Sequence, residues 1–400
     1  MLLIDLLKLN NAKNIPSATP AIADSNCAVI IGDSEETSPA LRQLQQQFAS
    51  IIFQHTSLDL YFSQGSANPS WAGDVIKTNR FHLLPCQGSS CLWPRDWGIK
   101  FQQTFWRLLP PAVDLPLTTA PKTPLSQLEI KNLIANSSAP FWPRGDLGGN
   151  MMAFTASLWA VGDSASEELM KQMTAQFNLT HPPLKLTTAW TMIGHLDELW
   201  AFLAPKNASE NSYLFYADPL QGLALFKQMT PQARKELLQS INPSPERSAG
   251  LDLGMMLENE QRQDFAAAVD LKHAAFKALA QANQTYAAMI QNDLKKIETY
   301  LAQTPNRPPS LVKIALPILW IPAFIQDAYG LESDNAISAG ANSVNFWHGE
   351  NIIITAKWPW QNWQMAIERQ MQKYPGKVFY LDTQVLHQRR GGLHCFTNEL

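Results

Sequence analysis

Short apolar runs alternate with helical spacings along this chain. The apolar run Cys27–Gly32 predicts a buried strand, and the spacing of Leu41, Leu44, Phe48 and Ile51 predicts an amphipathic helix. The same patterns predict strands at 58–62, 74–84, 151–154, 184–189, 212–216, 312–316, 343–346, 351–356 and 378–381, and helices at 39–52, 125–135, 166–177, 220–229 and 363–373. Strands that alternate with helices in this way indicate an α/β fold.

The longest helical pattern covers residues 256–303, which are rich in Ala, Gln, Lys and Glu and contain neither Pro nor Gly. We expect its charges to form a solvated face. Because no break in composition marks a domain boundary, we predict one α/β domain over 27–400 with this helical segment as an insertion. Residues 1–26 are predicted to be a polar lead-in.

Composition narrows the class of protein. The 400 residues are 46% apolar and 16% charged, which is typical of a globular chain with a large core. With 31 basic and 34 acidic residues the net charge is −3, so no broad basic face for nucleic acid is indicated. No apolar run approaches the roughly 20 residues of a membrane span.

The N-terminal sequence and the cysteines bear on the compartment. Asp5 interrupts the first apolar run, which makes a poor signal peptide and favours a cytoplasmic protein, with secretion left open. Cys86 and Cys91 are close enough in sequence to pair in an oxidising compartment, and that pairing is also left open. Four cysteines in 400 residues do not form a disulfide framework.

The most distinctive stretch surrounds Cys395. The pair Gly391–Gly392 allows a tight backbone turn just before it. Arg389 and Arg390 keep the local potential positive, which favours the reactive thiolate. The alternative is a buried structural cysteine.

Three further polar residues, Asp96, His195 and Asp197, lie on loops that contain Gly or Pro, next to apolar strands. A Cys nucleophile with a His for proton transfer is a familiar pairing. Two additional carboxylates suit a substrate that carries a delocalised cation, because a guanidinium offers five N–H donors in a plane. Asp96 and Asp197 would then hold its nitrogens and leave its central carbon facing Cys395.

Two other interpretations stay open at this point. His195, Asp197, His394 and Cys395 could form a zinc site, although neither local pair has the spacing of common zinc motifs. A plain structural role for these residues is the second. We predict no metal and no cofactor.

The ordered set of motifs is specific where each motif alone is weak. It consists of Trp93-x-x-Asp96, Gly149-Asn150, Gly194-His195-x-Asp197-Glu198-x-x-x-Phe202, Asn345 and Arg389-x-Gly391-x-x-His394-Cys395-x-Thr397-Asn398. Over about residues 27–400 the chain resembles the catalytic domain of the peptidyl-arginine deiminases, within the guanidine-modifying (pentein) superfamily. That resemblance implies a five-bladed α/β propeller with the site on its central axis.

The resemblance also implies hydrolysis of an arginine guanidinium to citrulline and ammonia. Cys395 would attack the guanidinium carbon and form a covalent thiouronium intermediate. His195 would give a proton to the departing ammonia and then help to activate water. Asp96 and Asp197 would hold the guanidinium.

Four further residues are implied to contact the substrate: Trp93, Arg144, Asn150 and Arg389. Trp93 would pack along the aliphatic stem, and Arg389 matches the arginine by which peptide-directed members hold the substrate backbone. We therefore expect an arginine-containing peptide or protein as substrate. For Arg144, a salt bridge with Asp146 within the loop is the alternative.

The chain also departs from the family pattern at positions that bear on calcium binding and on the substrate. Where vertebrate members have acidic calcium ligands, this chain has Arg95, Trp97, Ile99, Met151 and Met152, so we predict calcium independence. The stretches around residues 95–98 and 147–150 look more like agmatine deiminases. A small guanidine substrate (agmatine or free arginine) and a non-catalytic binding module therefore remain as alternatives. The sequence does not indicate an oligomeric state.

Overall fold

The structure is a computed structural model, and it describes the helices and strands between residues 28 and 399 with gaps. The described ranges are 28–31, 38–64, 81–85, 95, 98–101, 104–108, 129–133, 147–205, 210–240, 267–303, 310–326, 332–349, 351–387 and 391–399. The strands are β1 Ala28–Ile31, β2 Asp59–Gln64, β3 Phe81–Pro85, β4 Gly98–Phe101, β5 Thr104–Arg107, β6 Glu129–Asn132, β7 Met151–Thr155, β8 Leu158–Gly162, β9 Leu184–Leu186, β10 Trp200–Leu203, β11 Ser212–Asp218, β12 Leu311–Pro317, β13 Trp320–Gln326, β14 Glu332–Ser338, β15 Trp347–Gly349, β16 Ile352–Ala356, β17 Lys377–Leu381 and β18 Thr397–Glu399. The α-helices are α1 Pro39–His55, α3 Glu167–Gln176, α4 Pro219–Gln228, α5 Pro231–Gln239, α7 Ala274–Ala302, α8 Gln361–Met371, α9 Gln384–His387 and α10 Leu393–Phe396, and the 3₁₀ turns are η7 Gly148–Asn150 and η8 Leu196–Glu198.

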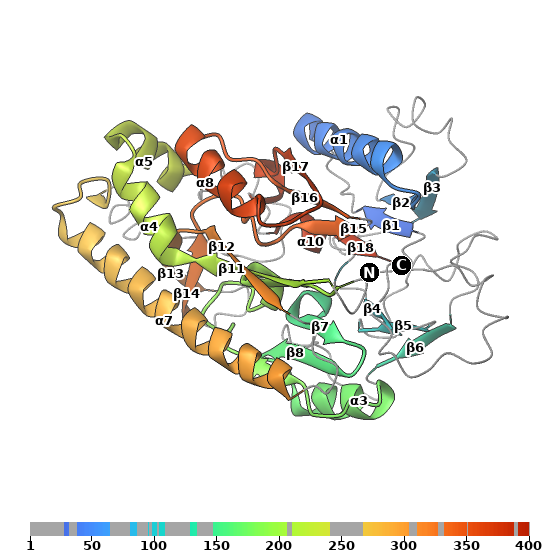
Figure 1. The fold of residues 1–400 in the computed structure, drawn as a ribbon. Coiled ribbons are helices and arrows are strands. Elements are labelled where there is room, and N and C mark those ends of the chain that lie inside the picture. Colours follow the sequence, from blue (N-terminus) through green and yellow to red (C-terminus); the bar gives the residue numbers. More distant parts are fainter. Residues whose placement is uncertain are drawn as a thin grey trace.

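The strands form several small sheets with the larger helices on their outer sides (Figure 1). Within the described ranges, five sheets share one pairing pattern, in which a central strand pairs antiparallel with one neighbour and parallel with another. These sheets are β4–β5–β6, β7–β8–β9, β10–β11–β12, β15–β16–β17 and β18–β1–β2–β3. The mixed α/β fold is confirmed. The closed five-bladed arrangement stays a prediction.

Helix α1 supports the segment that carries Cys395. Ser38 caps the helix by accepting a hydrogen bond from the Leu41 backbone N–H at 3.2 Å, and Pro39 starts it with a preset φ. Its apolar face is buried in one cluster with Leu393 and Phe396 of α10. Strand β18 follows α10 directly and pairs antiparallel with β1. The cysteine is thus held between a helix–helix contact and a sheet.

Helix α7, drawn in orange, runs along the outside of the molecule beside α4 (Figure 1). Its Asn283 exchanges two hydrogen bonds with the backbone of Trp320 in β13, at 2.7 and 3.0 Å. Its Tyr286 stacks on Trp190 with ring centroids 4.4 Å apart. These contacts fix the segment that leads to His195. None of the helices in the described part of the chain combines the length and hydrophobicity that crossing a bilayer requires.

Most predicted elements are confirmed, among them β1, α1, α3, α4 and α8. The helix predicted at 125–135 is wrong: the chain forms β6 there, because the edge of β5 offers a parallel partner with Phe105 opposite Ile130. The strand predicted at 343–346 is also wrong, since Asn342 Oδ1 accepts the Val344 N–H at 2.9 Å and bends the chain.

Two predictions are shorter in the structure than in the sequence pattern. The strand predicted at 184–189 ends at Leu186. In the segment 256–303, turns occupy most of 267–273 and α7 begins at Ala274, where the His273 ring accepts the Ala275 N–H at 3.2 Å and caps the helix. Residues 241–266 lie outside the described ranges.

Candidate active site

Cys395 lies in the short helix α10 and is 8% exposed. Gly392 precedes the helix, and a Cβ at that position would lie 2.5 Å from Oδ1 of Asn345. Only glycine lets the backbone approach this amide so closely. The Thr397 hydroxyl donates to the Leu393 carbonyl at 2.9 Å and closes the turn behind the cysteine.

Asn345 holds the cysteine through both ends of its side-chain amide. Its Oδ1 accepts the backbone N–H of His394 at 2.8 Å and that of Cys395 at 3.3 Å. Its Nδ2 donates to the Cys395 Sγ at 3.1 Å. The asparagine is 3% exposed, so these bonds form away from water. Asn345 therefore fixes the position of the sulfur.

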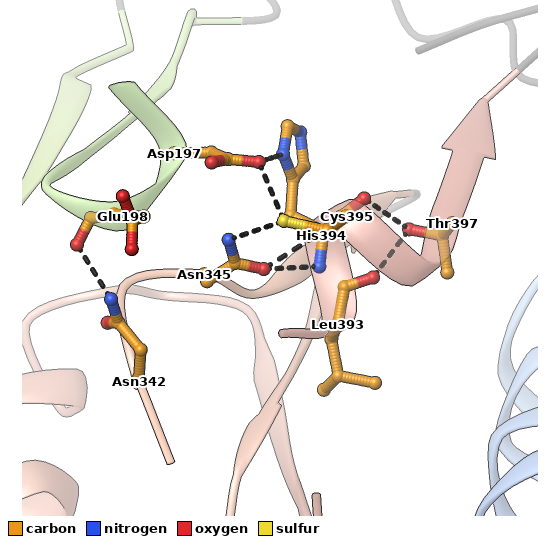
Figure 2. A network of polar contacts seen from close by, with 8 residues as sticks. All are labelled: Asp197, Glu198, Asn342, Asn345, Leu393, His394, Cys395 and Thr397. Atoms are coloured by element: carbon orange, nitrogen blue, oxygen red, sulfur yellow. Dashed lines mark hydrogen bonds and ion pairs between the residues drawn. The ribbon is translucent and has the colours of Figure 1, made fainter. Parts of the chain in front are cut away.

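Asp197 meets the cysteine from η8, almost two hundred residues earlier in the chain. Its Oδ2 accepts hydrogen bonds from the Cys395 thiol at 3.3 Å and from His394 Nδ1 at 2.9 Å, as Figure 2 shows. Burial raises the pKa of Asp197, but the hydrogen bonds from His394 and Cys395 and the nearby imidazole of His195 outweigh burial and lower it overall. The carboxyl group is thus ionised at neutral pH.

The second oxygen of this carboxylate, Oδ1, is buried and has no hydrogen-bond partner within the described residues. A buried carboxylate oxygen without a donor is costly. Asp197 also lines a cavity of about 70 Å³. The geometry therefore suits a ligand that brings an N–H donor into this cavity.

His394 shares this cavity and is a neutral imidazole at neutral pH. Burial lowers its pKa to about 4, helped by the positive charge of Arg95 and opposed by Asp197. Because a carboxylate can only accept, Nδ1 of His394 carries the proton that bonds to Asp197. This bond fixes the orientation of the Asp197 carboxylate.

His195 precedes Asp197 and faces the same way. The residue is 3% exposed and has extended backbone angles, φ −102° and ψ 149°. A Cβ on Gly149 would lie 2.6 Å from His195 Nδ1 and 2.9 Å from Asp197 Oδ2. The His195 and Asp197 side chains therefore lie against the same side of Gly149.

The walls of the 70 Å³ cavity are mainly apolar. Besides Asp197 and His394, the polar groups that line it are Arg95 and His348, and the apolar residues are Met151, Met152, Ala153, Trp159, Leu196, Trp200, Ala201, Phe202, Val344 and Phe346. Burial lowers the pKa of His348 well below its usual value, and the positive charge of Arg95 adds to this. Asp197 is thus the one acidic group in this lining within the described part of the chain.

A second, smaller cavity of about 30 Å³ borders Cys395, which does not line the first cavity. Besides Cys395, the polar side chains that line it are Glu198, Ser338, Asn342, Asn345 and His387. Glu198 follows Asp197 in η8, yet each residue lines a different cavity. Burial raises the pKa of Glu198 to about 7, against the effect of its contacts with Thr191 and His195, while the charge of Asp197 adds to the rise.

The structure brings together Cys395 and Asp197 of the predicted catalytic set and places His195 beside Asp197. Asp96, Trp93, Arg144 and Arg389 lie outside the described residues, as do Cys86 and Cys91. Asn150 is fully buried, its Nδ2 donates to the Ser164 hydroxyl at 3.4 Å, and it lines neither cavity. Its contact with substrate stays a prediction.

Sequence reasoning did not assign roles to three residues that the geometry makes prominent: Asn345, His394 and Glu198. The available signal for His394 was its place beside the cysteine. Among the described residues, no group of three or more His, Cys, Asp or Glu side chains is placed to hold a metal ion. The would-be zinc ligands Asp197, His394 and Cys395 instead hydrogen-bond one another directly.

Comparison with known proteins is consistent with this geometry. The family model for protein-arginine deiminase (PAD) matches residues 156–400. A comparison with curated protein sequences gives no match. The chain is similar in fold to the C. jejuni agmatine deiminase, with a TM-score of 0.52 and 13% identity over 94% of this chain and 93% of that one. It is equally similar to the agmatine deiminase of Enterococcus faecalis, with a TM-score of 0.52 and 14% identity over 97% and 99%.

Proposed function

This chain belongs to the protein-arginine deiminase family, and from that premise we propose that it hydrolyses the guanidinium of a peptidyl arginine to citrulline and ammonia. The observation that supports this most is the Asp197 carboxylate. One of its oxygens bonds the Cys395 thiol, and the other is buried without a partner among the described residues. A guanidinium that donates an N–H to Oδ1 of Asp197 would satisfy this oxygen and lie beside the sulfur.

The cavity suits the rest of an arginine side chain. Its apolar walls, such as Met152 and Phe346, match the aliphatic stem. Asp197 supplies the negative charge that a permanently protonated guanidinium needs when it leaves water. Asp96 is the second carboxylate in this proposal, and Trp93 packs along the stem.

The reaction begins with the transfer of the Cys395 proton to His195. The thiolate then attacks the guanidinium carbon and a C–S bond forms. His195 returns the proton to a nitrogen, the C–N bond breaks, and ammonia leaves a thiouronium intermediate.

The second half consumes water. His195 takes one proton from a water molecule while the water oxygen bonds to the same carbon. The C–S bond then breaks, His195 returns that proton to the cysteine thiolate, and the remaining hydroxyl proton passes to ammonia, which leaves the ureido group and ammonium. The net change is guanidinium plus water to ureido group plus ammonium. The neutral His394 holds the Asp197 carboxylate in place throughout, and Asn345 stabilises the thiolate through Nδ2.

Calcium has no part in this proposal. Arg95, Met151 and Met152 line the cavity, and a dication needs several oxygen ligands that these side chains lack. The guanidinium of Arg95 would also repel it. The residues present do not fit a calcium site at this place.

We also propose that residues 27–400 form one catalytic domain after a lead-in at 1–26, with the repeated sheets arranged as a five-bladed propeller. The five sheets with one pairing pattern support that arrangement.

The second candidate is a small guanidine substrate. It is favoured by the similarity in fold to two agmatine deiminases, whereas the match of Arg389 to a peptide-holding arginine favours a peptide. Replacing Arg389 by Ala separates them: activity on a blocked arginine should fall, and activity on agmatine should not.

The test is an assay for ureido product and ammonia with an N-acyl arginine amide, free arginine and agmatine, each with and without a chelator. We expect turnover of the blocked arginine, no effect of the chelator, and no turnover by Cys395→Ser. A haloacetamidine should label Cys395 in the wild type. Absence of both labelling and turnover would leave a non-catalytic binding module as the correct interpretation.

A further inference from the structure

Glu198 connects the two loops that meet at Cys395. Asn342 Nδ2 donates to the main-chain oxygen of Glu198 at 2.7 Å, which ties Glu198 to the segment that carries Asn345 (Figure 2). On the other side, Oε2 of Glu198 lies 2.5 Å from the Thr191 hydroxyl. The carboxyl group also accepts from the backbone of His195. One side chain thus contacts the turn from which His195 projects.

That turn is held in an unusual conformation. Gly194 has φ +79°, in the left-handed region. Its N–H donates to the Thr191 hydroxyl at 3.0 Å, and its carbonyl accepts from the Thr188 hydroxyl at 2.8 Å. Thr191 is therefore the link between Glu198 and the residue before His195.

Counting hydrogens at Thr191 indicates the state of Glu198. The Thr191 hydroxyl has one hydrogen and two acceptors within reach: the Thr188 carbonyl at 3.0 Å, which also accepts the Thr191 backbone N–H, and Oε2 of Glu198. Its oxygen accepts from Gly194, so both O···O contacts contain a hydrogen only when Glu198 supplies a second one. A carboxylic acid can donate this bond and a carboxylate cannot. The short contact at Glu198 is thus satisfied when Glu198 carries a proton.

We propose that Glu198 is a positioning residue for His195 and that it acts as a carboxylic acid, not as a carboxylate. This rests on the proposed deiminase function. Loss of the proton would turn the Thr191 hydrogen toward Glu198, remove its bond to Thr188 and loosen the Gly194 turn. His195 would then lose its position relative to Asp197.

The surroundings of Glu198 support the acid form. The titratable groups that face it are His195 and Asp197 from its own segment and, across the smaller cavity, His387 and Cys395. No Lys or Arg lines that cavity in the described part of the chain. Burial without a permanent cation raises the pKa of Glu198 to about 7, so the acid form persists below neutral pH and is lost above it.

The decisive variant is Glu198→Gln, whose amide can donate to Thr191 but cannot ionise. We expect its kcat at pH 6 to lie within about twofold of the wild type, with the loss of kcat above pH 7 removed. Thr191→Val should lower kcat with little change in KM, and Thr191→Ser should restore it. Glu168→Gln on exposed α3 is the matched control, and its profile should follow the wild type.

Two outcomes overturn the proposal. A loss of about 10²-fold or more at pH 6 in a folded Glu198→Gln protein would make Glu198 a proton-transfer group. An unchanged pH profile would show that its ionisation does not matter.

A readout without substrate separates this proposal from the proposed function. An acid whose pKa is raised by folding loses stability as pH rises from its unfolded value toward about 7. Glu198→Gln should therefore gain stability over the wild type between pH 5 and pH 8 in urea unfolding, even if no guanidine is turned over. An equal difference at both pH values would contradict the acid form.

Discussion

Asn345 offers the sharpest test of how the site is built, because three hydrogen bonds of the Cys395 segment depend on one amide. Asn345→Ala removes all three: two to the backbone N–H groups of His394 and Cys395 and one to the sulfur. Each bond contributes about 1 kcal/mol net, and the two stranded N–H groups add a desolvation cost. We expect the free energy of unfolding to fall by about 3 kcal/mol.

Asn345→Asp separates the two bonds to the backbone from the bond to the sulfur. A carboxylate still accepts from the two N–H groups, but it cannot donate to the Cys395 Sγ, and it places a negative charge beside the thiolate. Stability should therefore fall less than in the alanine variant, whereas labelling of Cys395 by a haloacetamidine should slow by about tenfold or more, since the thiolate is the reactive form.

The assays are urea unfolding at pH 7 and the labelling rate of Cys395 followed by mass spectrometry. Asn211→Ala, at an exposed position far from the cysteine in sequence, serves as the control for a lost asparagine. If Asn345→Ala unfolds within about 0.5 kcal/mol of the wild type, or if Asn345→Asp labels as fast as the wild type, the clamp described above is not what holds the sulfur.

Two further changes test the same site. Gly149→Ala would place a methyl group 2.6 Å from His195 Nδ1, so we expect a loss of about 10²-fold in kcat and of about 1–3 kcal/mol in stability; full activity would show that the turn can shift freely. The fold lowers the pKa of His394 from 6.5 to about 4. Between these pH values the unfolded chain is protonated at His394 and the folded chain is not, so the free energy of unfolding should fall by about 3 kcal/mol as the pH drops from 6.5 toward 4. His394→Asn should abolish that part of the acid loss in pH-dependent unfolding, and an unchanged slope would contradict the assignment.

Local patterns in the sequence predicted many of the helices and strands. The spacing of Leu41, Leu44 and Phe48 predicted α1 because one face of that helix is buried. Strand β6 could not be predicted in this way, since its four residues form a strand only against the edge of β5, which is distant in sequence. The bend at 343–346 likewise depends on one side-chain bond from Asn342.

In the candidate site, too, some features could be predicted from the sequence and others could not. Residue chemistry and spacing identified Cys395 and Asp197, and the structure places them in contact. The contact between His394 and Asp197 could not be predicted, because it depends on how η8 and α10 meet. The lowered pKa of Asp197 and the raised pKa of Glu198 could not be predicted either. These two adjacent residues have different surroundings in the fold, and the surroundings decide the direction of each shift.

The pairing of β18 with β1 has a consequence for biosynthesis. Cys395 immediately precedes β18, which pairs with β1 more than 360 positions earlier in the chain, so the sulfur can meet Asn345 only after residues 393–399 have left the ribosome. A nascent or prematurely terminated polypeptide would therefore carry the acidic half of the centre without the thiol. Under the proposed mechanism, the chain would gain its reactivity only after translation has passed this point.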